Sequence, residues 1–139
     1  MEATSRRPAG PRGAIGAAAE SAAVEHLRCA GWLVLGRNLR VGRDEVDIVA
    51  QEPGEPGVTV VVEVRARTGA GFGAAEESVD ARKVARLYRA AWTLRRQGHA
   101  SLPAAGSKQA AWRVDLLTLR RDARGRWRVE RHLRGLQPP

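Results

Sequence analysis

The fold is decided by the stretch Glu45-Val46-Asp47-Ile48-Val49-Ala50-Gln51-Glu52-Pro53-Gly54-Glu55-Pro56-Gly57-Val58-Thr59-Val60-Val61-Val62-Glu63-Val64-Arg65-Ala66. Its two ends are rich in β-branched side chains, which favour strands. The Pro-Gly segment at 52–57 combines the residues that favour tight turns. The stretch therefore predicts two antiparallel strands joined by a hairpin turn. The near-continuous valines of the second strand predict a central strand that is covered on both faces.

Further elements are predicted on both sides of this hairpin from apolar spacing and turn residues. Helical spacing runs from Ile15 to Ala30 and ends at the cap residue Gly31. A second helix is expected over 79–97, and further strands over 32–35, 111–119 and 127–133. The order α-β-β-β-α-β-β predicts an α/β fold, in which a mixed central sheet is flanked by helices.

The length of 139 residues is that of one ordinary domain. We expect a disordered basic arm at 1–13, a single domain at 14–136 and a tail at 137–139. Loops are expected at 68–73, which is rich in glycine, and at 99–110.

The composition argues against secreted and membrane proteins. The single cysteine permits no internal disulfide. No apolar run is long enough to span a membrane, and no apolar stretch of a signal peptide follows Arg6 and Arg7. We therefore expect a cytoplasmic protein with no membrane partner.

Charge is distributed unevenly along the chain, whose net charge is +9. The segment 41–80 carries three positive and nine negative residues, whereas 81–139 carries fifteen positive and three negative residues. A basic chain indicates a polyanion partner, DNA or RNA. An acidic centre within it favours a divalent cation held beside phosphate. The alternative is that most of these acids lie in solvated turns, and that a GC-rich genome explains the preference for Arg over Lys.

The hairpin brings two carboxyl groups together. A roughly symmetric turn places Asp47 opposite Glu63, and Glu63 shares a face with Arg65. Two opposed carboxylates among valines repel each other and lose solvation, so a positive charge is expected between them. Either Arg65 or a hard divalent cation could supply it. In the alternative interpretation, Arg65 and Arg67 neutralise the acids in a structural ion-pair network.

Asp47, followed by Glu63-Val64-Arg65, resembles the core of the PD-(D/E)xK nucleases, which have the restriction-endonuclease-like fold. The chain is more closely similar to the YraN-like family of small, largely uncharacterised bacterial proteins, over about residues 13–119. The matching stretches are Ile15 to Glu20, Ala30-Gly31-Trp32, Gly36-Arg37-Asn38, Asp44 to Ala50, Val61 to Arg67, Gly73 to Val79, Lys83 and Trp112 to Asp115.

The resemblance implies a role for each acid. Asp47 and Glu63 would be metal ligands, with Glu20 as an additional acid and the carbonyl of Val64 as a further oxygen ligand. Glu45 would be an outer or alternative ligand. The implied cofactor is Mg²⁺ or Mn²⁺, and the implied reaction is metal-assisted hydrolysis of a phosphodiester bond.

Two departures from the family pattern weaken the expectation of catalysis. Arg65 stands where the family usually has Lys, and an arginine is always protonated, so it cannot act as a base. Lys83 could replace it from the second helix, although the family has a lysine there as well. Asp44 stands where a glycine is usual, and it adds a negative charge. Whether the chain is an enzyme is left open.

The second helix offers a face for nucleic acid, with Arg82, Arg86 and Arg89. A solvated face without a ligand is an equal alternative. We expect a nucleic-acid-binding protein, with DNA favoured over RNA, that is either a metal-dependent endonuclease or a relative with weakened activity; branched DNA is suggested by analogy to the Holliday-junction resolvases of this fold. A homodimer is left open. The alternatives are a non-catalytic nucleic-acid-binding module and an adaptor that binds other proteins.

Overall fold

The computed structural model describes residues 11–67, 79–103 and 111–138. Its elements follow the predicted order. They are α1 (Pro11–Cys29), β1 (Leu33–Val41), β2 (Asp44–Gln51), β3 (Val58–Arg67), α2 (Ala81–Gln97), β4 (Ala111–Arg121) and β5 (Trp127–Leu133). The glycine-rich loop expected at 68–73, most of the loop expected at 99–110 and most of the expected arm lie outside the described residues.

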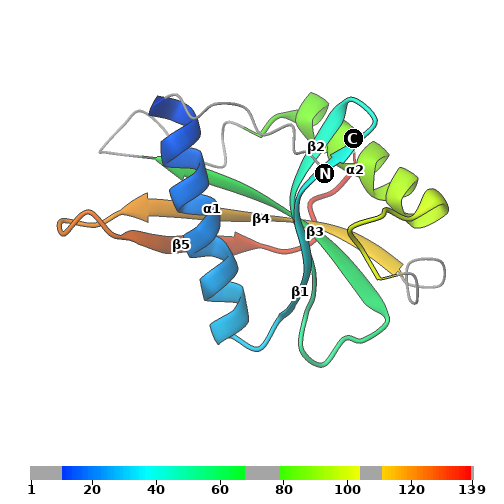
Figure 1. Cartoon of the computed structure of the whole chain (residues 1–139), viewed down its shortest axis with the longest axis horizontal. Helices are drawn as coiled ribbons and strands as arrows, with labels where there is room; N and C mark the ends of the chain where they lie inside the picture. The colour runs from blue at the N-terminus through cyan, green and yellow to red at the C-terminus, as the bar shows by residue number, and fades with distance from the viewer. Residues whose placement is uncertain (1–10, 68–78, 104–110, 139) are drawn as a thin grey trace.

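The strands form one mixed sheet in the order β1-β2-β3-β4-β5 (Figure 1). Neighbouring strands are antiparallel except for β3 and β4, which are parallel. The chain between these two contains α2, because parallel neighbours require a long crossover. β3 lies at the centre of the sheet, as its valines predicted, and segment 52–57 connects β2 to β3.

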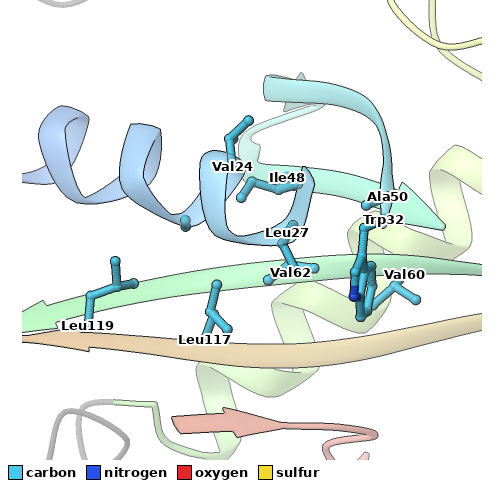
Figure 2. Packing of buried hydrophobic residues seen from close by; sticks show 10 residues of the cluster. Val24, Leu27, Trp32, Ile48, Ala50, Val60, Val62, Leu117 and Leu119 are labelled. Carbon is cyan, nitrogen blue, oxygen red and sulfur yellow. The ribbon is translucent and has the colours of Figure 1, made fainter. Parts of the chain in front are cut away.

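Successive valines of β3 face two different cores. Val60 and Val62 pack with Leu27 of α1 on one face, whereas Val61 packs with Leu87 of α2 on the other. All five are at most 2% exposed. Figure 2 shows the first core, where α1 lies across β2, β3 and β4. The helices therefore cover opposite faces of the sheet. No helix in the described part of the chain is both long and apolar enough to cross a membrane.

α1 begins earlier than expected and ends where expected. It starts at Pro11, within the expected arm, because proline favours the first turn of a helix. At its other end, Trp32 N–H donates to the Leu27 carbonyl and Gly31 N–H to that of Arg28. This pattern is a Schellman motif, in which Gly31 adopts a φ of 89°.

β1 is longer than the predicted strand at 32–35, and it continues to Val41. β1 pairs with β2 from Leu33 to Val41, and Leu39 and Val41 are buried against α2. Segment 37–40 was left outside the predicted strand because it is mostly polar, but pairing with β2 and the burial of Leu39 and Val41 make it part of β1. Asn38 has a left-handed backbone, with a φ of 54°.

α2 is positioned by its caps. Asp80 accepts a hydrogen bond of 2.9 Å from the backbone N–H of Lys83 at the N-terminus, and Gly98 N–H donates to the Leu94 carbonyl at the other end. The buried side of α2 is apolar, so its arginines face solvent. This arrangement directs the first turn of α2 toward the end of the β2–β3 pairing, where Lys83 meets Glu63.

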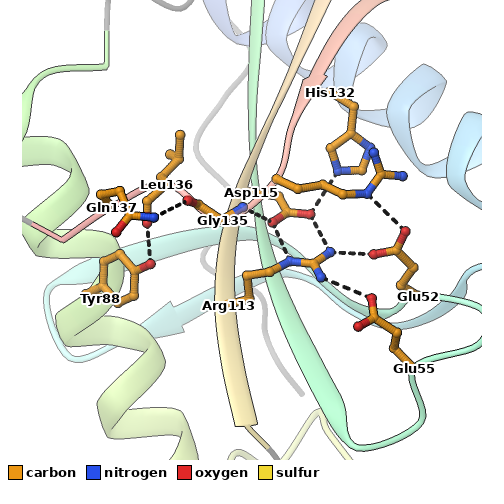
Figure 3. Close-up of polar contacts among 10 residues, drawn as sticks. Glu52, Glu55, Tyr88, Arg113, Asp115, His132, Gly135, Leu136 and Gln137 are labelled. Atoms are coloured by element: carbon orange, nitrogen blue, oxygen red, sulfur yellow. Dashed lines mark hydrogen bonds and ion pairs between the residues drawn. The ribbon is translucent and has the colours of Figure 1, made fainter.

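A buried ionic cluster joins the C-terminal segment to the sheet (Figure 3). Asp115 of β4 is fully buried, and it accepts hydrogen bonds from Arg113 at 2.8 and 2.9 Å and from Gly135 N–H at 2.9 Å. The His132 ring lies 2.9 Å from the same carboxylate. Arg113 also pairs with Glu52 at 2.6 Å. We call this the Asp115 cluster; because every group is partnered within the protein, its role is structural.

Candidate active site

Asp47 and Glu63 meet where β2 and β3 stop pairing. The last paired residues are Ile48 and Val62, and the same register places Asp47 opposite Glu63 at the next step. The symmetric hairpin predicted this opposition. The Asp47 carboxylate accepts a hydrogen bond of 2.9 Å from the backbone N–H of Val64. The Asp47 side chain thus accepts a hydrogen bond from the main chain of β3 at the point where the β2–β3 pairing ends.

Glu63 is buried between two cations. Its side chain is 5% exposed, and its Oε2 lies 3.0 Å from Arg65 Nη2 and 3.6 Å from Lys83 Nζ. The first contact comes from the same strand, as alternation predicted, and the second from α2. Arg65 Nε is buried and has no hydrogen-bond partner among the described residues. Arg67, which could have shared the neutralising role, pairs with Glu130 at 3.2 Å.

Both carboxyl groups of the pair are held toward their protonated forms. Burial, and then the charge of Asp47, raise the pKa of Glu63 to about 7. Burial also raises the pKa of Asp47, against the opposing effect of the Val64 N–H. A hydrogen bond between the two carboxyls raises the pKa of Glu63 and lowers that of Asp47. The titrations of the two groups are therefore linked, and each pKa depends on the charge of the other carboxyl.

Glu20 approaches this acidic pair from α1, close enough for the charge of Asp47 to act on it. It stands at helical spacing from Ala23, Val24 and Leu27, so it occupies the buried side of the helix and is 8% exposed. Burial, and then the charge of Asp47, raise its pKa to about 7. Its Oε1 is buried without a hydrogen-bond partner in the part of the chain that is described.

Asp44, which departs from the family pattern, carries no unbalanced charge. Arg89 of α2 donates two hydrogen bonds to it, at 2.8 and 3.0 Å. These hydrogen bonds lower the pKa of Asp44, so it stays ionised. The unusual acid therefore ties the start of β2 to α2. Arg89, a predicted nucleic-acid contact, is already engaged by this pair.

The remaining predicted residues lie at the margin of the site. The Glu45 side chain is 56% exposed and lies 3.9 Å from Arg40. Arg82 and Arg86 are exposed on the solvent side of α2. Arg86 lines the same surface pocket as Glu45 and Lys83, and Arg82 is not part of that lining.

The region of the chain that holds these acids is shared with a protein family. A model of the uncharacterised protein family UPF0102 matches residues 19–119, which include Glu20, the Asp47–Glu63 pair and Lys83. The chain belongs to UPF0102. This is the YraN family that the sequence motifs indicated.

UPF0102 relatives are similar over most of the chain. A protein of Deinococcus radiodurans is 40% identical over 110 residues, which cover 78% of this chain and 81% of the relative. A Mycolicibacterium smegmatis protein is 41% identical over 90 residues, or 63% and 72% of the two chains. SfsA of Pyrococcus furiosus, solved with Ca²⁺, is 15% identical with a TM-score of 0.34 and covers 85% of this chain and 60% of its own. That likeness is too low to carry an argument.

The carboxylates of Asp47 and Glu63 in this UPF0102 site are oxygen ligands of the kind that Mg²⁺ and Mn²⁺ prefer. Within the described ranges no three His, Cys, Asp or Glu side chains are grouped closely enough to hold a metal ion, so Glu20 is not gathered with Asp47 and Glu63 into a triad. Mg²⁺ commonly takes one or two carboxylates and keeps several waters. A bound cation would offset the negative charge of the ionised pair.

Two residues at this UPF0102 site were not assigned a role from the sequence. Arg37 Nη2 lies 3.7 Å from the Glu20 carboxylate, and the side chain of Asn38 also favours the charged form of Glu20. The register of β1 and β2 places Asn38 opposite Asp47. Side chains two residues apart on a strand normally lie on the same face of a sheet. Val46 nevertheless packs in the core beneath α2 and Ile48 in the core beneath α1, so the strand pair twists between them. The Gly36-Arg37-Asn38 motif was the available signal.

Proposed function

We propose that the chain binds nucleic acid and hydrolyses its phosphodiester bonds with a divalent metal ion, Mg²⁺ or Mn²⁺. The observation that carries the proposal is the buried Asp47–Glu63 pair, whose pKa values are both raised, next to Arg65 and Lys83. Perturbed carboxyl groups beside specific charges mark candidate functional sites. The net charge of +9 supports a polyanionic substrate, and DNA is proposed before RNA.

Asp47 and Glu63 would hold the metal ion, with the Val64 carbonyl as a third oxygen. When bound, the ion would lower the pKa of a water molecule and offset the charge that develops on the phosphate. The Val64 N–H fixes the orientation of the Asp47 carboxylate. Arg65, always protonated, attracts the phosphate but accepts no proton. Lys83 Nζ, 3.6 Å from Glu63, is the amine that can orient the attacking water.

A second candidate is a nucleic-acid-binding module without hydrolytic activity. It is favoured by the contacts that Arg65 and Lys83 make with Glu63, since they balance its charge without a metal ion. Such a module would bind nucleic acid with strong salt dependence and with no metal requirement.

The test is cleavage of branched, duplex and single-stranded DNA and of RNA with Mg²⁺ or Mn²⁺, with binding recorded in the same samples. Asp47→Asn and Glu63→Gln are compared with Glu25→Gln, which removes one exposed acid from α1. Cleavage by the native chain and by Glu25→Gln, lost in the other two variants, supports the proposal. Binding without cleavage under every metal condition favours the second candidate, and neither binding nor cleavage contradicts both.

A further inference from the structure

A basic pocket lies beside the candidate active site, between the β1–β2 turn and the first half of α2. Its volume is about 290 Å³, and Leu87 forms an apolar part of its wall. Its polar lining consists of Arg40, Arg43, Asp44, Glu45, Lys83 and Arg86. Four of these six side chains are cationic and two are acidic, so the lining is net positive.

Two of the four cations that line the pocket have no ion-pair partner among the described residues. Asp44 is engaged by Arg89, which lies outside the lining, and Glu45 lies 3.9 Å from Arg40. Lys83 is engaged by Glu63. Arg43 and Arg86 act on Asp44 only through their charge, and neither makes a hydrogen bond or ion pair within the described part of the chain.

We propose that this pocket binds a phosphate group, held between Arg43 of the β1–β2 turn and Arg86 of α2. A guanidinium presents several N–H donors in a plane that matches the oxygens of a phosphate. Two such groups from different elements lining one pocket, both without partners among the described residues, form a clamp for an anion. A pocket of this size is at the lower end for small-molecule sites, which suits a phosphate group with part of its sugar.

The position of the pocket gives the clamp a role in substrate binding. Lys83 lines the pocket and also contacts Glu63, so it connects the two sites. A strand with one phosphate in the clamp would extend past Lys83 toward the Asp47–Glu63 pair. This role in substrate binding rests on the proposed function, whereas phosphate binding itself does not.

Phosphate binding is tested with EDTA present and at low salt, so that the result does not depend on hydrolysis. The probes are inorganic phosphate, followed by NMR, and a short oligonucleotide with either a 5′-phosphate or a 5′-hydroxyl, followed by fluorescence anisotropy. Arg43→Gln and Arg86→Gln are compared with Arg95→Gln, which removes the same charge from an exposed position of α2 outside the lining.

The clamp predicts that Arg43→Gln and Arg86→Gln each weaken phosphate binding about tenfold, and Arg95→Gln less than threefold. Stronger binding of the 5′-phosphate that is lost in Arg86→Gln would assign the clamp to a strand end. Equal binding of both oligonucleotides, weakened alike by Arg86→Gln, would assign it to an internal phosphate. Equal losses in all three variants, or no binding of phosphate by the native chain, would overturn the proposal.

The result of the phosphate-binding test can be distinguished from the result of the cleavage assay. Specific loss of phosphate binding in Arg43→Gln and Arg86→Gln, without any cleavage in the assay described above, leaves the clamp standing and removes the hydrolysis. Cleavage that depends on Asp47, with phosphate binding insensitive to Arg43 and Arg86, leaves the hydrolysis and removes the clamp.

Discussion

The backbone N–H of Val64 donates to the Asp47 carboxylate across 2.9 Å, one step beyond the last pair of the β2–β3 ladder. A main-chain donor that β2 would otherwise satisfy is therefore used to orient an acidic side chain. Glu63, the residue before Val64, lies opposite that acid in the same register, and the charge of Asp47 raises its pKa. The end of the ladder is thus the structural reason that the two carboxyls can meet.

Replacing Asp47 with Asn should lower the pKa of Glu63 and leave the fold intact. The amide oxygen can still accept from Val64 N–H, so we expect the fold to be retained. The pKa of Glu63 should fall below its present value of about 7, because the charge of Asp47 raises it. NMR titration of the Glu63 carboxyl measures this shift. A Glu63 pKa that is unchanged in Asp47→Asn would contradict the pairing.

Metal ions should stabilise the native chain. Because a ligand that binds only the folded state raises its stability, the melting temperature should rise with Mn²⁺ concentration. The rise should disappear in Asp47→Asn and persist in Glu25→Gln, which removes an exposed charge of α1. A thermal shift titration with each variant checks this. An equal rise in all three proteins would place the metal elsewhere.

The stability contributed by Glu20 should decrease as the pH rises. Its folded pKa is raised from 4.5 to about 7, so the folded chain keeps a proton that the unfolded chain loses first. The resulting loss of folding free energy grows between pH 4.5 and about pH 7 and is constant above that range. It amounts to about 1–3 kcal/mol. Relative to the native chain, Glu20→Gln should therefore gain stability at pH 8 but not at pH 4. Urea unfolding at both pH values measures the difference; equal gains at both would refute it.

Arg65→Lys should increase the rate of cleavage if the chain is a nuclease. In the native chain, Arg65 lies 3.0 Å from the Glu63 carboxylate. A lysine at this position keeps the positive charge, and it can also exchange a proton with water. General base catalysis justifies an expected gain of about tenfold or more. Arg65→Gln, which keeps neither property, is the matched control and should be less active than the native chain. A lysine variant no faster than native would show that the arginine is not limiting.

The Asp115 cluster should be the most sensitive ionic site for stability. Burial alone would raise the pKa of Asp115, but hydrogen bonds from His132, Arg113 and Gly135 lower it below the usual range, so its stabilisation is lost as acid protonates it. Asp115→Ala removes the buried acceptor that Arg113, His132 and the Gly135 N–H share, which should cost about 3 kcal/mol, although Arg113 keeps its pair with Glu52. Glu130→Ala removes a surface pair with Arg67 and should cost about 1 kcal/mol or less. Urea unfolding compares the two, and similar losses would contradict the assigned role.

The central part of the fold could be predicted because its determinants are local. Strand propensity and the Pro-Gly turn place Asp47 opposite Glu63, and alternation alone places Arg65 beside Glu63. The covered position of β3 follows from its run of valines. Gly31 was correctly predicted to cap α1, because the last helical turn and the cap are adjacent in the sequence.

Other parts depend on docking between distant segments and could not be predicted. The polar run at 37–40 gives no strand signal of its own, and pairing with β2 makes it part of a strand. The pair of Asp44 with Arg89 joins residues 45 positions apart, and it depends on how α2 sits on the sheet. For the same reason the sequence gives no signal that Arg43 and Arg86 line one pocket.

The parallel pairing of β3 with β4 has a consequence for the order in which the molecule forms. That pairing joins Val58 to Ala111, about fifty positions away, and such contacts form slowly because a long loop must close first. The hairpins of β1, β2 and β3 close much shorter loops. Asp47 and Glu63 should therefore approach each other early in folding, whereas Lys83 reaches them only when the crossover docks. During folding, the acidic pair would exist before its partner from α2 arrives.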